Sequence, residues 1–144
     1  EEAARIWLGR KSAFGAIGQI SDYMCLDGTI PVSSLPMVLR RIGELSEEYG
    51  LRVGNVFHAG DGNMHPLLVF DGPDEAEVSR VRAAFAEIVK LALSLGGTIA
   101  AEHGVGTLKR EFVSDELDPT QLAVMRTIRN SLDPLHRLNP GKKF

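Results

Sequence analysis

Apolar side chains recur every three or four residues in several parts of the chain, and this spacing predicts amphipathic helices. The clearest case begins at Ser33 or Ser34 and ends at Gly50, a residue type that commonly terminates helices. A longer helix is predicted over residues 75–95, and its second half is apolar on more than one side. The two apolar stripes are Leu35, Val38, Leu39, Ile42, Leu45 and Tyr49, then Val78, Val81, Phe85, Ile88, Ala92 and Leu95.

Helices are also predicted at both ends of the chain. Residues 1–19 form the first, with Ala4, Trp7, Leu8 and Phe14 available for burial. A short helix is predicted over residues 107–112, and a longer one starts at Asp118-Pro119. The apolar residues of that last helix are Leu122, Met125, Ile128 and Leu132.

Strands are predicted where apolar runs are short and are bounded by turn residues. Residues 28–32 and 96–101 each suit one short strand, whereas residues 20–27 have no regular pattern. Residues 55–70 suit a hairpin whose two faces are both largely apolar, so helices or another domain should cover both sides. We therefore expect an α+β fold, a mostly antiparallel sheet with helices on its faces.

The predicted hairpin carries two histidines. Its apolar runs flank Gly60-Asp61-Gly62-Asn63, and Asp-Gly is a strong hairpin signal. A turn centred on Asp61 and Gly62 places His58 directly opposite His65, with Cβ atoms roughly 4.5–5.5 Å apart. That distance suits either two hydrogen-bonded core histidines or two ligands of one metal ion. A one-residue slip would send the two side chains to opposite faces.

A second stretch, residues 96–106, favours the metal. It predicts a short buried strand that enters a glycine-rich turn at Glu102 and His103. Two histidines and one carboxylate form a usual open ligand set, which leaves room for a substrate. In an extended backbone, adjacent side chains point to opposite sides. We therefore expect Glu102 to complete a ligand set with His58 and His65, and His103 to act beside it as a base.

Composition sets outer bounds on function. The chain has 144 residues, 44% hydrophobic and 24% charged, with a net charge of -3, which favours one soluble domain and gives no argument for nucleic acid. The single Cys25 excludes an internal disulfide and suits a reducing compartment. No apolar run reaches the length of a membrane span. Because the chain begins at Glu1 inside a predicted helix, we expect it to be a piece of a longer protein.

Three motifs together resemble the C-terminal domain of FAD-linked oxidases, the family of the glycolate oxidase FAD subunit, D-lactate dehydrogenase and D-2-hydroxyglutarate dehydrogenase. They are His58-Ala-Gly-Asp-Gly-Asn-Met-His65, Glu102-His-Gly-Val-Gly106 and Leu138-Asn-Pro-Gly-Lys142. The resemblance covers essentially the whole chain, as one domain over residues 1–144, and is strongest to the glycolate oxidase branch. It implies a cap domain whose N-terminal FAD-binding domain is absent from this chain.

The resemblance also implies residue roles. His58, His65 and Glu102 match the ligands of a divalent metal, zinc or manganese or iron, and His103 matches the catalytic base. Arg10 matches an arginine that binds the substrate carboxylate. Asn63 and Asn139 fall in segments that line the substrate and the flavin, respectively. Phe14, Cys25 and Leu67 stand where the hydroxyglutarate branch has polar residues, so a smaller 2-hydroxy acid is expected.

On this hypothesis the complete enzyme oxidises a D-2-hydroxy acid of glycolate or D-lactate type and passes hydride to FAD. Electron-transfer subunits are expected partners, and the expected location is cytoplasmic or peripheral to the inner membrane through those subunits. The fragment alone is expected to be inactive. Two alternatives remain at this point: a non-catalytic module that binds a small acid or a partner through a structural histidine pair, and a metal-dependent hydrolase.

Overall fold

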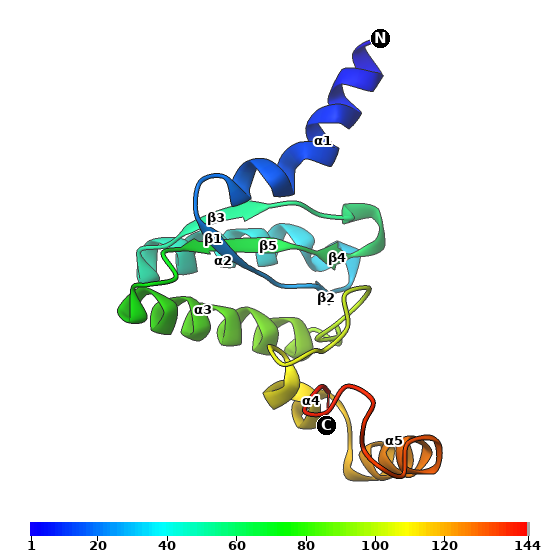
Figure 1. The fold of residues 1–144 in the computed structure, drawn as a ribbon. Helices are drawn as coiled ribbons and strands as arrows, with labels where there is room; N and C mark the ends of the chain where they lie inside the picture. Colours follow the sequence, from blue (N-terminus) through cyan, green and yellow to red (C-terminus); the bar gives the residue numbers. More distant parts are fainter. Residues whose placement is uncertain (144) are drawn as a thin grey trace.

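Two small antiparallel sheets form the centre of the fold (Figure 1). The structure is a computed structural model and describes residues 1–143. The larger sheet has the order β1-β5-β3, with β1 at Asp22–Cys25, β5 at Pro66–Phe70 and β3 at Arg52–Asn55. The smaller sheet pairs β2 (Gly28–Thr29) with β4 (Asn63–Met64).

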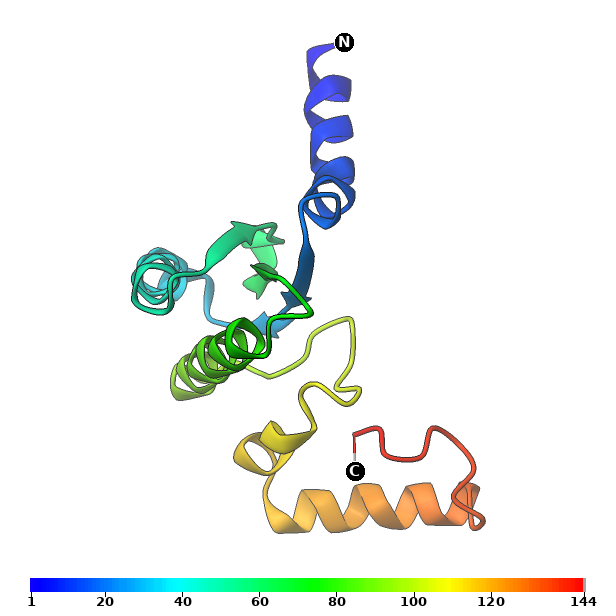
Figure 2. The same cartoon turned by 60° about the vertical axis from the view of Figure 1, so that its left-hand side comes forward.

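Helices α2 (Leu35–Tyr49) and α3 (Glu75–Ser94) lie side by side and cover one face of the larger sheet (Figures 1 and 2). Gly50 ends α2 in the left-handed conformation, and the Asp74 side chain accepts hydrogen bonds from the first amides of α3. Their apolar stripes meet Leu68 and Phe70 on β5 in one core. The fully buried residues of that core include Leu26, Val38, Ile42, Met64, Leu68, Val81, Phe85 and Ile88.

The opposite face of the sheet receives only one end of α1 (Glu2–Gly18). The Phe14 ring lies 6.5 Å from the Tyr23 ring, and a Cβ added to Gly54 would lie 2.7 Å from Ile17 Cδ1. The remainder of α1 projects away from the sheet (Figure 2) and carries the exposed side chains of Ile6, Trp7 and Leu8. One face of the hairpin is therefore covered by α2 and α3, and the other is covered only in part, by the end of α1.

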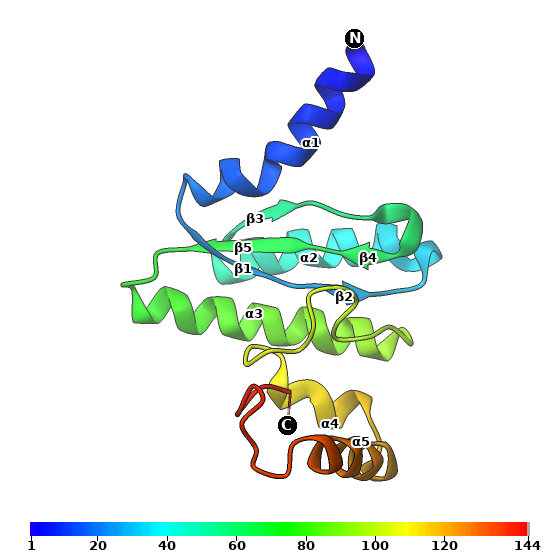
Figure 3. The ribbon, with the colours of Figure 1, turned by 45° about the vertical axis from the view of Figure 1, so that its right-hand side comes forward.

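The C-terminal helices lie beyond α3, away from the sheet (Figure 3). They are α4 (Val113–Glu116), which follows the short 3-10 helix η3 (Arg110–Phe112), and α5 (Pro119–Leu132). A capping box of Asp118 and Gln121 starts α5, where the Pro119 position predicts a helix start. Among residues 1–143, no helix combines the length and the apolar character that crossing a membrane requires.

The α+β fold class and the predicted helices at the start of the chain, after Ser34, after Asp74 and after Asp118 are confirmed. The predictions for short segments were less accurate. Residues 22–25 form β1 although their own pattern is weak, because β5 supplies the pairing partner. Residues 96–101 form only single bridges. Of the helix predicted over 107–112, only residues 110–112 are helical, as η3, and α4 follows beyond the predicted range.

Candidate metal and substrate site

His65 lies at the junction between the two sheets. Cys25 pairs with Leu67 in one sheet and Gly28 pairs with Met64 in the other, so the same register continued across the break places Asp27 opposite His65. The His65 Nε2 atom is 3.4 Å from Asp27 Oδ1, and both side chains are almost completely buried. Strand pairing therefore brings an imidazole and a carboxylate together beneath the surface.

The predicted pairing of His58 with His65 is wrong by two residues. Asn63, not His65, pairs with His58, and the Val56 amide bonds the His65 carbonyl. The turn is formed by η2 (Ala59–Asp61) and Gly62, whose φ of 73° favours glycine. Because side chains alternate with a period of two, an offset of two residues keeps both histidines on one face. Their ring centroids are 5.4 Å apart.

Glu102 and His103 reach the site because residues 98–101 run along β2. Thr98 and Ala100 each form a bridge to this edge, and the Ala101 amide bonds the Asp27 carbonyl. The backbone then curls, so that the amides of residues 101, 102 and 103 all donate to the Asp27 carboxylate, at 3.1, 3.2 and 2.9 Å. An extended backbone does not present three successive amides to one group.

The expectation that Glu102 and His103 point to opposite sides is therefore wrong. Both side chains lie at the same cluster, and three imidazoles surround one oxygen of Glu102. The distances from Glu102 Oε1 to Nε2 are 3.4 Å for His58, 3.1 Å for His65 and 3.7 Å for His103. The His103 ring stacks on the His65 ring, with centroids 4.7 Å apart and planes 7° apart.

Three polar atoms of the cluster form no hydrogen bond within the described residues, although one of them, His65 Nε2, lies close to two carboxylates. Both ring nitrogens of His65 and the Oδ1 atom of Asn63 are buried without a hydrogen bond. Buried polar atoms are nearly always satisfied, so orphans in such a cluster call for an ion or a ligand. The residues present therefore fit a divalent metal. The most compact donor group is Asp27, His65, Glu102 and His103, whose ligand atoms lie within 4.8 Å of one another.

Two donor sets thus overlap at the site. The predicted set of His58, His65 and Glu102 shares two members with the compact group. His58 lies outside that group, 3.4 Å from Glu102 and with its ring beside that of His65. His58, Glu102 and His103 are about half-exposed at their side chains, whereas His65 is buried. The cluster is accordingly closed on the sheet side and open on the side of the 102–103 turn.

Electrostatics keep the two buried groups in the states that a metal site requires. Burial lowers the pKa of His65, with a contribution from neighbouring His103, and thereby favours the neutral imidazole that binds metals. Burial alone would raise the pKa of Asp27. The amides of His103 and Glu102 and the Lys109 ammonium outweigh that effect and lower the pKa to about 2.

Sequence reasoning missed Asp27 and Lys109. Lys109 Nζ lies 3.2 Å from Asp27 Oδ2, and both side chains are buried. The Asp27-Gly28 dipeptide is locally typical of a turn, and Lys109 lies in a predicted short helix where nothing in the sequence marks it as buried. The signal that would have found them is tertiary, because it requires the pairing of β1 with β5 and the position of residues 98–101.

The two predicted substrate-binding residues differ in position. Asn63 belongs to the cluster, since its side chain is nearly buried and its Nδ2 atom donates to Glu102 Oε1 at 3.3 Å. Arg10 lies one helical turn before Phe14 on α1, and the Phe14 ring is 5.9 Å from the His65 ring. The spacing places Arg10 on the same face of α1 as Phe14. Within residues 1–143, the Arg10 side chain forms no ion pair or hydrogen bond.

The predicted flavin-region residue, Asn139, lies in the tail after α5. Its φ is 47°, and its carbonyl accepts the Lys142 amide at 3.2 Å. The tail returns to the loop after His103, where the Lys143 amide donates to the Gly106 carbonyl at 3.0 Å. The structure thus brings the tail to the glycine-rich loop, but in the described chain the Asn139 side chain forms no hydrogen bond with the cluster.

The residues expected to limit substrate size surround His65 on its own face of the sheet. Phe14 packs against the His65 ring, and Cys25 pairs with Leu67, two residues along β5 from His65. Burial raises the pKa of Cys25 to about 11, so the thiol stays neutral and apolar in character. Phe14, Cys25 and Leu67 themselves offer no charged group to a second carboxylate.

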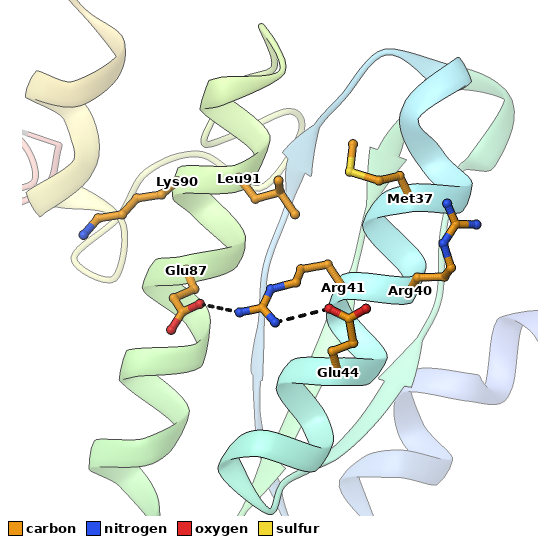
Figure 4. A pocket seen from close by; sticks show the side chains of 7 residues that line it. All are labelled: Met37, Arg40, Arg41, Glu44, Glu87, Lys90 and Leu91. Atoms are coloured by element: carbon orange, nitrogen blue, oxygen red, sulfur yellow. Dashed lines mark hydrogen bonds and ion pairs between the residues drawn. The ribbon is translucent and has the colours of Figure 1, made fainter.

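A separate groove of about 410 Å³ lies between α2 and α3 (Figure 4). There Arg41 pairs with Glu44, Glu48 and Glu87, and the Tyr49 hydroxyl donates to Glu87 at 2.6 Å. These groups tie the two helices together on the layer opposite the histidine cluster. The groove contains no histidine, and its central Arg41 is already paired with carboxylates. We therefore interpret the groove as a contact between α2 and α3 and not as a second functional site.

Comparison with known proteins identifies the family of the chain. Residues 1–143 match the family described as FAD linked oxidases, C-terminal domain. The chain is 46% identical over 144 residues to the glycolate oxidase subunit GlcD of Escherichia coli (strain K12), a match that covers 99% of this chain and 29% of the relative. It is 40% identical over 118 residues to the D-lactate dehydrogenase of Archaeoglobus fulgidus, covering 81% of this chain and 26% of that relative.

A third relative extends the match to another bacterial species. The glycolate oxidase subunit GlcD of Bacillus subtilis (strain 168) is 37% identical over 145 residues, covering 100% of this chain and 31% of the relative. The chain therefore spans under a third of the length of these relatives. By the extent of the family match, the chain belongs to the family of C-terminal domains of FAD-linked oxidases.

Proposed function

We propose that this chain is the substrate-binding domain of a flavin-dependent oxidoreductase that oxidises a D-2-hydroxy acid to the 2-oxo acid. Its relatives are named glycolate oxidase subunits and D-lactate dehydrogenases, which supports a substrate of the glycolate or D-lactate type. The observation that carries the proposal is the convergence of His58, His65 and His103 on one oxygen of Glu102.

In this proposal His58, His65 and Glu102 hold a divalent metal, zinc or manganese or iron. The unsatisfied nitrogens of His65 and its neutral, buried ring support a metal at this position. When bound, the metal would supply polarisation of the substrate hydroxyl, and the flavin would supply the acceptor for the hydride of carbon 2. Asn63 helps to orient Glu102, because its amide donates to the same oxygen that the imidazoles approach.

His103 takes the hydroxyl proton in the proposed reaction. Its side chain is about half-exposed, so a substrate can reach it, and its stacking on His65 holds the ring in place. The substrate loses one proton to this imidazole and one hydrogen with its electron pair to FAD, and the 2-oxo acid results. The nearby Glu102 carboxylate stabilises the imidazolium that forms.

Arg10 binds the substrate carboxylate in the proposed complex. It lies on the same face of α1 as Phe14, whose ring packs against His65, and no carboxylate of the described chain neutralises it. An unpaired guanidinium is suited to bidentate binding of a carboxylate. The apolar character of Phe14, Cys25 and Leu67 supports a small substrate with one carboxylate.

The proposed enzyme requires an FAD-binding domain that this chain does not contain, consistent with the share of each relative that it matches. The open side of the histidine cluster is the side of the 102–103 turn, and α1 and the C-terminal helices project from opposite ends of the molecule (Figure 2). Both carry large exposed apolar side chains: Ile6, Trp7 and Leu8 on α1, and Val124, Ile128 and Leu132 on α5. We propose that the FAD-binding domain covers this side, and that electron-transfer subunits accept the electrons in the cytoplasm or at the inner membrane.

The metal site is tested by measuring the zinc and manganese content of the purified chain and of a His58→Ala/His65→Ala double variant. We expect about one equivalent in the parent and a loss of at least tenfold in the variant, because two ligands are removed. His136→Asn is the matched control, since this exposed tail histidine has a φ of 51°, a conformation that asparagine tolerates. Retention of the metal by the double variant would contradict the assignment of ligands.

A further inference from the structure

The buried ion pair of Asp27 and Lys109 lies directly behind the histidine cluster. Asp27 is 0% exposed and Lys109 is 3% exposed, and Lys109 Nζ lies 3.2 Å from Asp27 Oδ2. Burying two charges is costly, and such pairs are seldom justified by stability alone. The pair belongs to neither the core nor the predicted ligand set, so its placement calls for a separate explanation.

The two oxygens of Asp27 have different surroundings. Oδ2 accepts the Ala101 amide at 3.1 Å, the His103 amide at 2.9 Å and the Lys109 ammonium at 3.2 Å. Oδ1 accepts only the Glu102 amide at 3.2 Å, and it lies 3.4 Å from His65 Nε2. Oδ2 therefore accepts two amides of the turn and the Lys109 ammonium, whereas Oδ1 lies at the edge of the metal-ligand group.

These contacts give Asp27 two competing roles. As an acceptor it binds the amides of residues 101–103, and these hydrogen bonds orient the side chains of Glu102 and His103 toward the cluster. As a carboxylate within 4.8 Å of the other ligand atoms, it is also positioned to bind the metal itself. The Lys109 ammonium favours the first role, because it neutralises the carboxylate and attracts it away from the cluster.

We propose that Asp27 and Lys109 are positioning residues: the pair fixes the Glu102–His103 turn and withholds the Asp27 carboxylate from the metal, which leaves coordination positions open for the substrate. The inference rests on the proposed metal site and assigns new roles to residues outside its ligand set. It makes opposite predictions for the two members of one ion pair.

The test compares Asp27→Asn and Lys109→Met in the chain of residues 1–144. Zn²⁺ affinity is measured by competition with a chelator, and the ligand environment is read from the visible spectrum of the Co²⁺-loaded chain. Asparagine keeps the volume of aspartate but presents an amide nitrogen to backbone donors. Methionine keeps the length of lysine without its charge. Ile42→Ala is the control, because it removes buried volume from α2 in the core.

For Asp27→Asn we expect Zn²⁺ affinity to fall about 10- to 100-fold, the range for residues that orient ligands, with an unchanged Co²⁺ spectrum at saturation. For Lys109→Met we expect Zn²⁺ affinity to stay equal or to rise, with a changed Co²⁺ spectrum, because the released carboxylate joins the ligands. Ile42→Ala should lower the unfolding temperature and leave both metal readouts unchanged.

Each contrary result has a definite meaning. A changed Co²⁺ spectrum in Asp27→Asn would make Asp27 a ligand and overturn the proposal. Loss of affinity with an unchanged spectrum in Lys109→Met would overturn the withholding role of the lysine. If Asp27→Asn does not fold, the Lys109→Met spectrum still decides. Failure of the parent chain to bind Zn²⁺ or Co²⁺ would overturn the proposed metal site. If the parent binds metal but the affinities and Co²⁺ spectra of the variants differ from those expected, only this inference is overturned.

Discussion

At the scale of single residues, His58 and His103 are alternative candidates for the same metal-ligand position. Both approach the same oxygen of Glu102, at 3.4 and 3.7 Å, and both are about half-exposed. His103 differs in that it stacks on buried His65 and that its amide is anchored by Asp27. We assign the metal to His58 and the proton to His103, and kinetics can separate these roles.

In the complete enzyme, His103→Ala should lower turnover by about 100- to 10,000-fold, the usual contribution of a general base, with metal content near normal. His58→Ala should lower turnover and metal content together. The measurement is turnover on glycolate or D-lactate beside elemental analysis, with His136→Asn as the control. An equal loss of metal in both variants would make His103 a ligand.

The common face of His58 and His65 could be predicted from the sequence because it depends only on their spacing. The odd spacing between His58 and His65 puts them on one face of an antiparallel hairpin for any turn with an even number of residues, so the face was predicted although the pairing was wrong. Asp27 and Lys109 could not be predicted as site residues, because they meet Glu102 and His103 only after three distant segments have paired.

At the scale of elements, the helices follow from periodicity, and the short strands follow from their partners. The stripe of α2 and its ending at Gly50 are local properties of the sequence. The four residues of β1 have no such local signal and become a strand against β5. Residues 98–101, which place Glu102 at the site, depend even more on their tertiary partners, since single bridges join them to the edge at β2.

One glycine controls how closely that segment approaches β2. A Cβ added at Gly97 would lie 1.8 Å from the Thr29 carbonyl oxygen and 2.9 Å from the Ala92 carbonyl oxygen. Gly97→Ala should therefore push residues 98–101 off the sheet and lower the free energy of unfolding by about 1–3 kcal/mol or more, with weaker metal binding. The measurement is urea unfolding combined with zinc titration.

The matched substitution is Gly43→Ala within α2, where an added Cβ meets no atom within 4 Å. There the alanine should raise the free energy of unfolding by about 0.5–1 kcal/mol, because glycine is unfavourable inside a helix. An equal change in the free energy of unfolding in Gly97→Ala and Gly43→Ala would mean that residues 98–101 adapt to the added methyl group. Their close approach to β2 would then not contribute to stability.

At the scale of the whole molecule, the apolar side chains are distributed unevenly. The core between the sheet and α2 and α3 is closed, while α1 and α5 expose a tryptophan and several large aliphatic residues. Exposed apolar surface of this kind marks contacts with other protein. We attribute it to the proposed FAD-binding domain.

Without that domain, the chain should self-associate as its concentration rises. Sedimentation velocity between micromolar and millimolar concentrations is the measurement, and Val124→Gln/Ile128→Gln on exposed positions of α5 should shift the equilibrium toward monomer. Arg82→Gln on α3 is the control, because it changes an exposed residue without removing apolar surface. A single monomeric species at every concentration would contradict this expectation.

The break between the two sheets also constrains how chain length can vary. One register runs through Cys25 and Leu67 on one side and Gly28 and Met64 on the other, with Asp27 and His65 between them. A single inserted or deleted residue in 25–28 or 64–67 would turn one member of this pair to the opposite face. Length changes in related chains should therefore accumulate in turns such as residues 71–74 and be absent from these two segments.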